Sequence, residues 1–235
     1  MGLADLHVHT IYSYDGTASV DAVLTQARKI GLDVIAITDH DEIAGSLKAL
    51  SLAPRYGMNV IPGIEITTSE GDLLALNVTE KVERNLPLTE TILRVGELGG
   101  FCIVPHPMAD GIGMKSLSAY SILKALRNAD VADILIGIET YNGTTIDKMN
   151  NHYAHILAEH LDLAQIGNSD AHVVEAIGLG VTEFTGSTVS ALIKAIHKRT
   201  TTIRKKKEWS RVRILGSWAA NYIGSAFTRR LLATR

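Results

Sequence analysis

The amino-acid sequence predicts an α/β fold built on a parallel sheet. Short apolar runs alternate with longer amphipathic segments along most of the chain. Several of the short runs are continuous in Val, Ile and Leu, as expected of parallel strands buried on both faces. The 235 residues are 46% hydrophobic and 20% charged, which is enough for one α/β domain with a sizeable core. The alternation alone leaves open whether the sheet is open or closed into a barrel.

Seven apolar runs are predicted as strands, and an eighth follows them near residue 180. Their lengths and their Val, Ile and Leu content favour strands over helices. In chain order they are residues 3–8, 32–38, 58–66, 72–78, 101–106, 133–140, 163–168 and 178–184.

Four segments between these runs have apolar residues at helical spacing. The segment 19–31 starts on Ser19 and stops at Gly31, and for 88–100 we expect Thr89 as the N-cap. The same pattern recurs at 116–128 and 187–199. Strands that alternate with helices in this way indicate βαβ units.

Composition and charge exclude several classes of protein. The single cysteine, Cys102, lies in an apolar run, so no disulfide forms within the chain and a reducing compartment is expected. We see neither a signal sequence nor an apolar stretch of the roughly 18 residues that a spanning helix needs, and we predict a cytoplasmic protein. The net charge of −2 combines −13 before Lys194 with +11 from Lys194 onward.

Acidic and histidine side chains follow nearly every predicted strand. In parallel α/β folds the carboxyl ends of the strands meet at one rim, where the chemistry takes place. His7 and His9 project from the same face of an extended segment, because residues two apart do so. This repeated pattern predicts a metal cluster at the rim, drawn from His7, His9, Asp15, Asp39, His40, Glu65, His106, Glu139, Asp170 and His172.

Five short motifs stand in a fixed order along the chain: "DLHVHT", "TDHD", "GIEITT", "PHP" and "NSDAH". Together they resemble the motifs of PHP-domain (polymerase and histidinol phosphatase) proteins, and most of all the stand-alone metal-dependent phosphoesterases of that family. The likeness runs from about residue 4 to about residue 183. It implies a distorted seven-stranded (β/α) barrel, similar to a TIM barrel, with two or three metal ions at its mouth.

The resemblance also implies how the metal ligands are shared. The first metal would take His7, His9, Glu65 and Asp170. Glu65 would bridge to a second metal held by His106 and by a residue soon after Glu65, and the third would be held by Asp15, His40 and His172. Mixed imidazole and carboxylate ligands suit Mn²⁺, Zn²⁺ or Fe²⁺ better than Ca²⁺. Asp72 stands where the family often has a histidine, and as a metal ligand it would favour Mn²⁺ or Mg²⁺ over Zn²⁺.

The resemblance implies a phosphoesterase that uses a metal-bound hydroxide. We expect it to hydrolyse a small phosphomonoester, a nucleotide or a short oligonucleotide. Glu65 and His40 would act in the catalytic cluster. Asp39 would support a metal ligand from behind, donate a proton to the leaving group, or be a capping acid at a strand end or helix start. Lys115 and Tyr141 are predicted to contact the substrate, the first through phosphate and the second by stacking. Two alternatives stay open: a metallohydrolase of the amidohydrolase type, and a non-catalytic PHP scaffold in a nucleic-acid complex.

The C-terminal residues differ in character from the rest. We divide the chain into a barrel, residues 1–200, and a basic amphipathic tail, residues 201–235. As a helix the tail would place Leu215, Trp218 and Ile223 on one side. We expect that apolar side to pack on protein and the block 204–207 to stay exposed. The alternatives are contact with RNA or with a membrane surface. The oligomeric state does not follow from the sequence.

Overall fold

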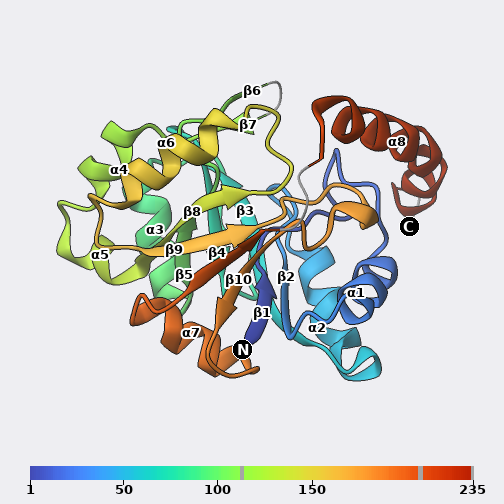
Figure 1. Cartoon of the computed structure of the whole chain (residues 1–235), viewed down its shortest axis with the longest axis horizontal. Coiled ribbons are helices and arrows are strands. Elements are labelled where there is room, and N and C mark those ends of the chain that lie inside the picture. The colour runs from blue at the N-terminus through green and yellow to red at the C-terminus, as the bar shows by residue number, and fades with distance from the viewer. Residues whose placement is uncertain (112–113, 206–208, 234–235) are drawn as a thin grey trace.

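The computed structural model describes residues 1–111, 114–205 and 209–233, and its main feature is one sheet wrapped into a nearly closed barrel (Figure 1). The sheet has nine strands in the order β11-β10-β1-β2-β3-β4-β5-β8-β9. The strands are β1 (Gly2–Asp5), β2 (Val34–Ile37), β3 (Asn59–Thr67), β4 (Asp72–Leu76), β5 (Phe101–Val104), β8 (Leu135–Asn142), β9 (Ala164–Asn168), β10 (Gly180–Phe184) and β11 (Thr202–Lys205). The predicted barrel class is therefore confirmed, with nine strands in place of seven.

The sheet is mixed rather than wholly parallel, which corrects the prediction. β3 and β5 both pair antiparallel with β4, and β10 pairs antiparallel with β1 and with β11. The reason at β4 is the short turn before it, closed by a hydrogen bond from Thr68 N to Gly71 O at 3.0 Å. Such a turn can only reverse the chain, because a parallel connection needs a crossover of a dozen or more residues.

The helices cover the outside of the barrel and close one end of it. They are α1 (Val20–Lys29), α2 (Ala44–Tyr56), α3 (Leu88–Glu97), α4 (Ala119–Ala125), α5 (Ala129–Ile134), α6 (Met149–Ala158), the 3-10 turn η1 (Val174–Ala176), α7 (Val189–His197) and α8 (Arg211–Ala233). In Figure 1, α1 and α2 lie on one flank and α3 to α6 on the other. A small hairpin, β6 (Asp110–Gly111) with β7 (Met114–Lys115), stands apart from the sheet.

Helix starts were predicted with mixed success. Ser19 caps α1 as expected, since its Oγ accepts a hydrogen bond from Ala22 N at 3.2 Å. Thr89 is not the cap of α3, which already begins at Leu88 after Pro87. Proline suits such an N-terminal position, because it has no N–H to leave without a partner.

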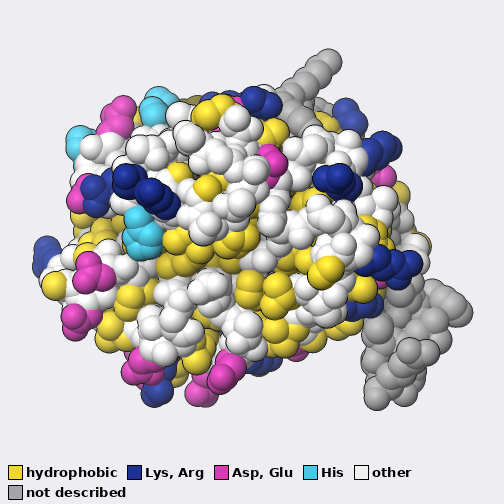
Figure 2. All heavy atoms as spheres, turned by 90° about the horizontal axis from the view of Figure 1, so that it is seen from below, with side chains coloured by type: hydrophobic (Ala, Val, Ile, Leu, Met, Phe, Trp, Pro, Cys, Tyr) yellow, Lys and Arg dark blue, Asp and Glu magenta, His cyan; other side chains and the backbone are white. Residues whose placement is uncertain are grey.

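The apolar interior of the barrel is filled by side chains from the strands and is sealed by α7. Leu192, Ala195 and Ile196 of α7 pack with strand residues such as Leu74 and Ile103, and all are buried. This seal lies on the side of the N-terminus, which Figure 2 views directly. There, apolar side chains show over the middle of the face, while charged side chains of both signs lie around its edge. The rim that carries the predicted ligands is at the opposite end.

The barrel closes through a side chain as well as through strand pairing. Thr182 of β10 bridges to β9: its Oγ1 donates to Gly167 O at 2.9 Å and accepts from Gly167 N at 3.1 Å. Thr201, which directly precedes β11, donates from Oγ1 to Gln165 O of β9 at 2.8 Å and so holds the start of β11 near β9. The predicted tail thus starts within the barrel, because β11 pairs with β10 from Thr202 to Lys205. The expected division at residue 200 falls just before the last strand of the sheet.

The long helix α8 presents an unexpected side to the barrel. Trp218 and Ile214 pack on the core cluster that contains Trp209, and Ser225 is 7% exposed. Leu215 is 51% exposed and Ile223 77% exposed, so the predicted burial of the whole apolar side is wrong. The docked side of α8 therefore includes Ile214 and Trp218 but not Leu215 or Ile223. Arg204 and Lys205 are exposed as expected, whereas Lys206 and Lys207 lie outside the described residues.

None of the helices in the described ranges combines the length and the apolar character needed to cross a bilayer.

The position of β11 predicts different outcomes for two shortened chains. A chain that ends at Thr201 lacks β11 and leaves the edge of β10 unpaired, so we expect aggregation during expression. A chain that ends at Lys205 keeps the sheet but loses the buried Trp209, and we expect it to fold with a lower thermal midpoint. Solubility and thermal unfolding would test this. Equal behaviour of the two chains would show that β11 contributes nothing to the barrel.

Candidate metal centre

The predicted ligands converge at one rim of the barrel because of where the strands end. His7 and His9 follow β1, His40 follows β2, and His106 follows β5, while Asp170 and His172 follow β9. Asp72 reaches the same rim by another route. It is the first residue of β4, which runs antiparallel to β3, so its start lies beside the end of β3 and it pairs with Thr67. The rim therefore collects ligands from parallel and antiparallel strands alike.

Glu65 is the centre of the cluster. It lies within β3, is fully buried, and has a histidine close to each carboxylate oxygen. Its Oε1 is 3.1 Å from His106 Nε2. Its Oε2 is 3.1 Å from both His7 Nε2 and His40 Nδ1, and 3.2 Å from His9 Nε2. One carboxylate thus connects four imidazoles, as a bridging ligand between cations would.

Asp170 is a second buried carboxylate shared between histidines. Its Oδ1 lies 3.4 Å from His7 Nε2 and 3.2 Å from His9 Nε2. Its Oδ2 accepts a hydrogen bond from Asn142 Nδ2 at 3.0 Å, so the carboxylate is held in orientation. His7, His9 and Asp170 form one group of converging ligand atoms, and His7, Glu65 and His106 form another.

A third group lies nearer to the solvent. Asp15 Oδ2 is 3.2 Å from His172 Nε2 and 3.5 Å from His40 Nε2, and His9 completes the group. The other ring nitrogen of His172 lies 3.0 Å from the backbone oxygen of Asp170, which orients the ring. His40 contacts Asp15 through Nε2 and Glu65 through Nδ1, so it links this group to the centre.

Glu139 orients the ligands from behind. It is 1% exposed, and its Oε1 is 3.2 Å from His7 Nδ1 and accepts from Asn168 Nδ2 at 2.9 Å. Its Oε2 accepts from His106 N at 2.8 Å and from Asn142 Nδ2 at 3.1 Å. A carboxylate behind a metal-binding histidine fixes the ring and makes it a better ligand. The sequence indicated Glu139 only through its place at a strand end and gave no sign of the two asparagines.

Asp39 faces away from the cluster, which weighs against the proton-donor role considered for it. It is fully buried, and both oxygens accept hydrogen bonds from Thr10, from N at 2.6 Å and from Oγ1 at 2.8 Å. A Cβ on Gly45 would come within 2.1 Å of Asp39 Oδ2, so only glycine fits there. Asp39 therefore fixes the residue after His9 rather than reaching a substrate.

Two ligands lie on backbone that disfavours side chains other than glycine. His106 has φ of 25° and Asp170 has φ of 53°. Such values cost of order 1–3 kcal/mol and persist where the surroundings enforce them, as at ligand-binding sites. For Asp170, Asp5 is part of that enforcement, because its carboxylate accepts from Ser169 N at 3.0 Å and Gly178 N at 2.9 Å.

Opposite charges dominate the ionisation of the cluster when no cation is present. Burial alone would lower the pKa of His7, but the carboxylates of Asp170 and Glu65 outweigh it and raise the pKa well above its usual range. Burial would likewise lower the pKa of His40, but Glu65 and Asp15 outweigh it and raise this pKa to about 10. Burial would raise the pKa of Glu65, yet the charges of His7 and His40 hold it well below normal. Protons on the imidazoles thus occupy the place that cations would take.

The donor set fits divalent cations. Among the described residues, two buried carboxylate oxygens at the rim have no hydrogen-bond partner: Asp15 Oδ1 and Asp72 Oδ1. His9 Nε2 also makes no hydrogen bond of good geometry, although it lies 3.2 Å from Glu65 Oε2 and from Asp170 Oδ1. Buried polar atoms normally have partners, and a cation beside these atoms would provide one. Asp72 is not in the three converging groups and lies at their edge. Burial and the nearby charge of Glu65 raise the pKa of Asp72 to about 6, a cost that a neighbouring cation would relieve.

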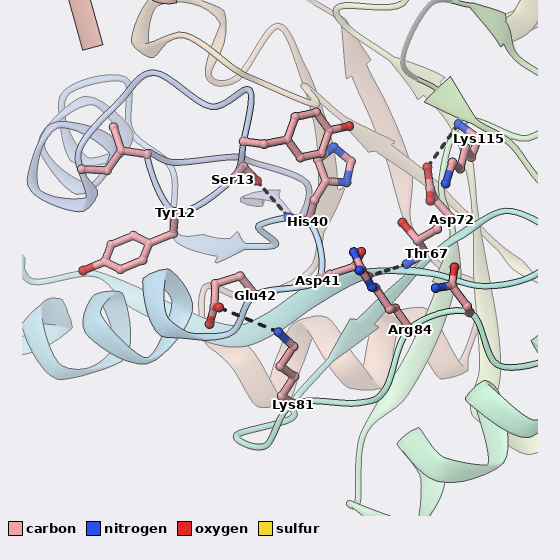
Figure 3. A pocket seen from close by; sticks show the side chains of 13 residues that line it. Tyr12, Ser13, His40, Asp41, Glu42, Thr67, Asp72, Lys81, Arg84 and Lys115 are labelled. Atoms are coloured by element: carbon pink, nitrogen blue, oxygen red, sulfur yellow. Dashed lines mark hydrogen bonds and ion pairs between the residues drawn. The ribbon is translucent and has the colours of Figure 1, made fainter. Parts of the chain in front are cut away.

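A cleft of about 660 Å³ opens beside His40 and Asp72 (Figure 3). Lys115, for which we predicted a phosphate contact, lines it, and its backbone N donates to Asp72 Oδ2 at 3.2 Å. Lys81 and Arg84 line it too, from the segment between β4 and α3. Neither was predicted from the sequence, because no motif surrounds them. Tyr14 lines the cleft as well, with its ring stacked on His40 at 5.0 Å between centroids.

The structure does not bring Tyr141 into this cleft. Tyr141 is 1% exposed, lines a separate cavity beside α6, and lies under Lys205 Nζ at 4.8 Å from the ring centroid. The register of the pairing between β8 and β9 shifts between Glu139 and Tyr141, so these two residues do not follow the regular alternation of a strand. The predicted stacking of Tyr141 on a substrate is therefore not supported, and Tyr14 is the better placed aromatic side chain.

Comparisons with known proteins agree with the motifs. The PHP domain family profile matches residues 5–212. Over 161 residues the chain is 34% identical to an uncharacterized protein from Methanocaldococcus jannaschii, covering 64% of this chain and 88% of that one. Over 65 residues it is 42% identical to a phosphoribosyl 1,2-cyclic phosphate 1,2-diphosphodiesterase from Eggerthella lenta, covering 28% and 24%. A two-domain protein from Bacteroides vulgatus containing a predicted PHP-like metal-dependent phosphoesterase matches in fold, with a TM-score of 0.67, 18% identity and coverage of 93% and 69%.

The raised pKa of His40 predicts how the metal-free protein responds to pH. The folded-state pKa of about 10 exceeds the unfolded value of about 6.5, so protonated His40 stabilises the fold fully below pH 6.5. That contribution is lost as pH rises toward 10. We expect the thermal midpoint of chelator-treated protein to fall from pH 7 to 9. Saturation with Mn²⁺ should reduce the fall, because the cation replaces the proton.

Calorimetry of His40→Gln, with the exposed His155→Gln as control, would test the assignment. The thermal midpoint of His155→Gln should fall between pH 7 and 9 as that of the wild type does. In His40→Gln this fall should be smaller. A thermal midpoint that stays constant or rises between pH 7 and 9 in the metal-free protein would contradict it.

Proposed function

The chain belongs to the PHP domain family, and we propose that it is a phosphoesterase that needs divalent cations for activity. The observation that carries this proposal is the contact of the Glu65 carboxylate with four histidines at the rim of a barrel. A fixed cluster of this composition holds cations in the arrangement used for phosphoryl transfer. Two or three cations, when bound there, would lower the pKa of a water molecule and offset the charge of a phosphate group.

The residues divide into three sets toward these cations. His7, His9 and Asp170 would hold the first cation, and His7, Glu65 and His106 would hold the second. Asp15, His40 and His172 would hold the third. Asp72, which is outside these groups, would offer a further oxygen to the second cation. The mixture of imidazole and carboxylate favours Mn²⁺, Zn²⁺ or Fe²⁺, and the carboxylates also admit Mg²⁺.

The cleft supports an anionic substrate that extends beyond the cluster. Arg84, Lys81 and Lys115 are exposed along its lining, next to His40 and Asp72 (Figure 3). Lys81 Nζ lies 3.9 Å from Glu42 Oε2, an exposed pair that contributes little and that a phosphate group can replace. Arg84 offers a planar fork that matches phosphate oxygens.

We therefore infer that the substrate is a small phosphate ester, a nucleotide or a short oligonucleotide. Tyr14 is 61% exposed beside the cleft and can stack on a base or sugar. The diphosphodiesterase from Eggerthella lenta acts, by its name, on a phosphorylated ribose, a substrate of this chemical kind. A cleft whose lining includes three basic side chains and the Tyr14 ring suits such a molecule.

A screen of purified protein would test the proposed activity. It would include phosphomonoesters, nucleoside 3′,5′-bisphosphates, short RNA and an amide substrate, each with Mn²⁺, Zn²⁺ or Mg²⁺. We expect release of phosphate or nucleotide and no amide hydrolysis. Amide cleavage without phosphoester cleavage would favour the amidohydrolase alternative. Protein without bound metal and without any activity would favour the scaffold.

Glu65 provides the sharpest single substitution. Glu65→Gln keeps the shape but removes the charge that faces four histidines, and we expect activity to fall about a hundredfold or more. Phosphate release at saturating metal would be measured. Glu97→Gln, at an exposed position of α3, is the control and should match the wild type. Near-normal turnover of Glu65→Gln would show that Glu65 is not the bridging carboxylate.

Arg84 is expected to act in binding rather than in chemistry. Arg84→Ala should raise KM about tenfold with little change in kcat, because a charged hydrogen bond to phosphate is lost. Arg94→Ala, an exposed arginine on α3, is the matched control and should leave both constants unchanged. Steady-state kinetics on the best substrate of the screen would decide. An unchanged KM in Arg84→Ala would remove Arg84 from the substrate site.

A further inference from the structure

The helix α8 is attached to the loop that carries Asp15. The indole Nε1 of Trp218 donates a hydrogen bond to the backbone oxygen of Asp15 at 2.9 Å. The two residues are 203 positions apart in the sequence. Asp15 is the carboxylate of the outermost group at the rim, with His172 and His40 at its Oδ2. A residue of the C-terminal helix thus contacts the backbone of a candidate ligand.

Packing fixes the position of the indole ring. Trp218 lies against the core cluster that contains Trp209, and Tyr12 from the loop packs on the same cluster. The ring of Tyr222 stacks on Trp218 at 4.9 Å between centroids. A ring held on both sides has a defined N–H direction, so the hydrogen bond constrains the carbonyl that accepts it.

The rest of the loop is tied down on either side of Asp15. Thr10 is bonded to Asp39, and Ser13 Oγ accepts from His40 N at 2.8 Å. On the other side, Thr17 N donates to His172 O at 3.0 Å. Gly16 packs so tightly against Thr10 that an added Cβ would lie 1.9 Å from its backbone oxygen. Between these fixed points, the hydrogen bond from Trp218 fixes the orientation of the peptide group that joins Asp15 to Gly16.

We propose that Trp218 is a positioning residue for the cation site formed by Asp15, His40 and His172. The inference rests on the proposed function, because it assumes that this group holds a cation. By fixing the Asp15 carbonyl, Trp218 keeps the carboxylate at 3.2 Å from His172 Nε2. It also limits the movement of the adjacent Tyr14, which stacks on His40. Partners that orient metal ligands typically change metal affinity about 10- to 100-fold when removed.

The experiment compares two Trp→Phe variants of the full chain by titration with Mn²⁺ alone. Trp218→Phe keeps an aromatic ring in the core but removes the N–H donor. Trp209→Phe makes the same change in the same core cluster, and in the described residues the indole that bonds to Asp15 O is that of Trp218. Free Mn²⁺ would be followed by electron paramagnetic resonance. We expect Trp218→Phe to weaken the weakest bound Mn²⁺ about tenfold and to leave the tighter ions unchanged. Trp209→Phe should bind all ions as the wild type does.

A double-mutant cycle with Asp15→Asn separates positioning from general destabilisation. If Trp218 acts through Asp15, then Trp218→Phe should have no further effect on Mn²⁺ binding in the Asp15→Asn background. Additive effects of the two changes, or equal losses in both Trp→Phe variants, would overturn the proposal. If the wild type binds no Mn²⁺, the proposed function fails. If Asp15→Asn binds Mn²⁺ like the wild type, the outer site is absent and the role of Trp218 fails with it.

Discussion

The buried carboxylate of Glu65 is the constraint on which the rest of the site depends. An isolated charge at a fully buried position would be costly, since burial disfavours ionisation. Four imidazoles from three segments of the chain surround it and offset that cost, either as protonated rings or as co-ligands of a cation. The barrel must therefore hold these ring nitrogens 3.1–3.2 Å from the Glu65 oxygens, and much of its architecture can be understood from that requirement.

Barrel closure meets this requirement at the junction of the first and last parts of the chain. Asp5 receives the backbone N–H groups of Ser169 and Gly178, and Asn168 Oδ1 accepts from Leu6 N at 2.8 Å. These bonds place Asp170 beside His7 and His9. Asn168 also donates to Glu139, which in turn orients His7 and His106. The ligands are thus fixed by a polar network beneath them, and removing one member would disturb several others.

Two different surfaces flank the cluster. On one side lies the cleft, which is lined by the basic residues Lys81, Arg84 and Lys115 and by the acidic residues Asp41, Glu42 and Asp72. On the other side α8 packs on the loop that carries Asp15, with Trp218 at the contact. The cleft side is therefore polar, with charges of both signs, while α8 contacts the backbone of the outer ligand group at Asp15.

The sequence by itself determined the fold class, the family and most residues of the candidate metal cluster. Period-two spacing at His7 and His9, and acids at the ends of apolar runs, follow from local rules of strand geometry. Local rules could not supply the direction of β4, which depends on a tight turn and puts Asp72 at the rim, nor the presence of β11 in a segment that resembles a basic tail. Only the tertiary structure decided that Asp39 faces Thr10, that Tyr141 lies away from the cleft and that Trp218 reaches Asp15. Each of these depends on which segments distant in sequence come to lie together, and side-chain spacing along one strand or helix carries no such information.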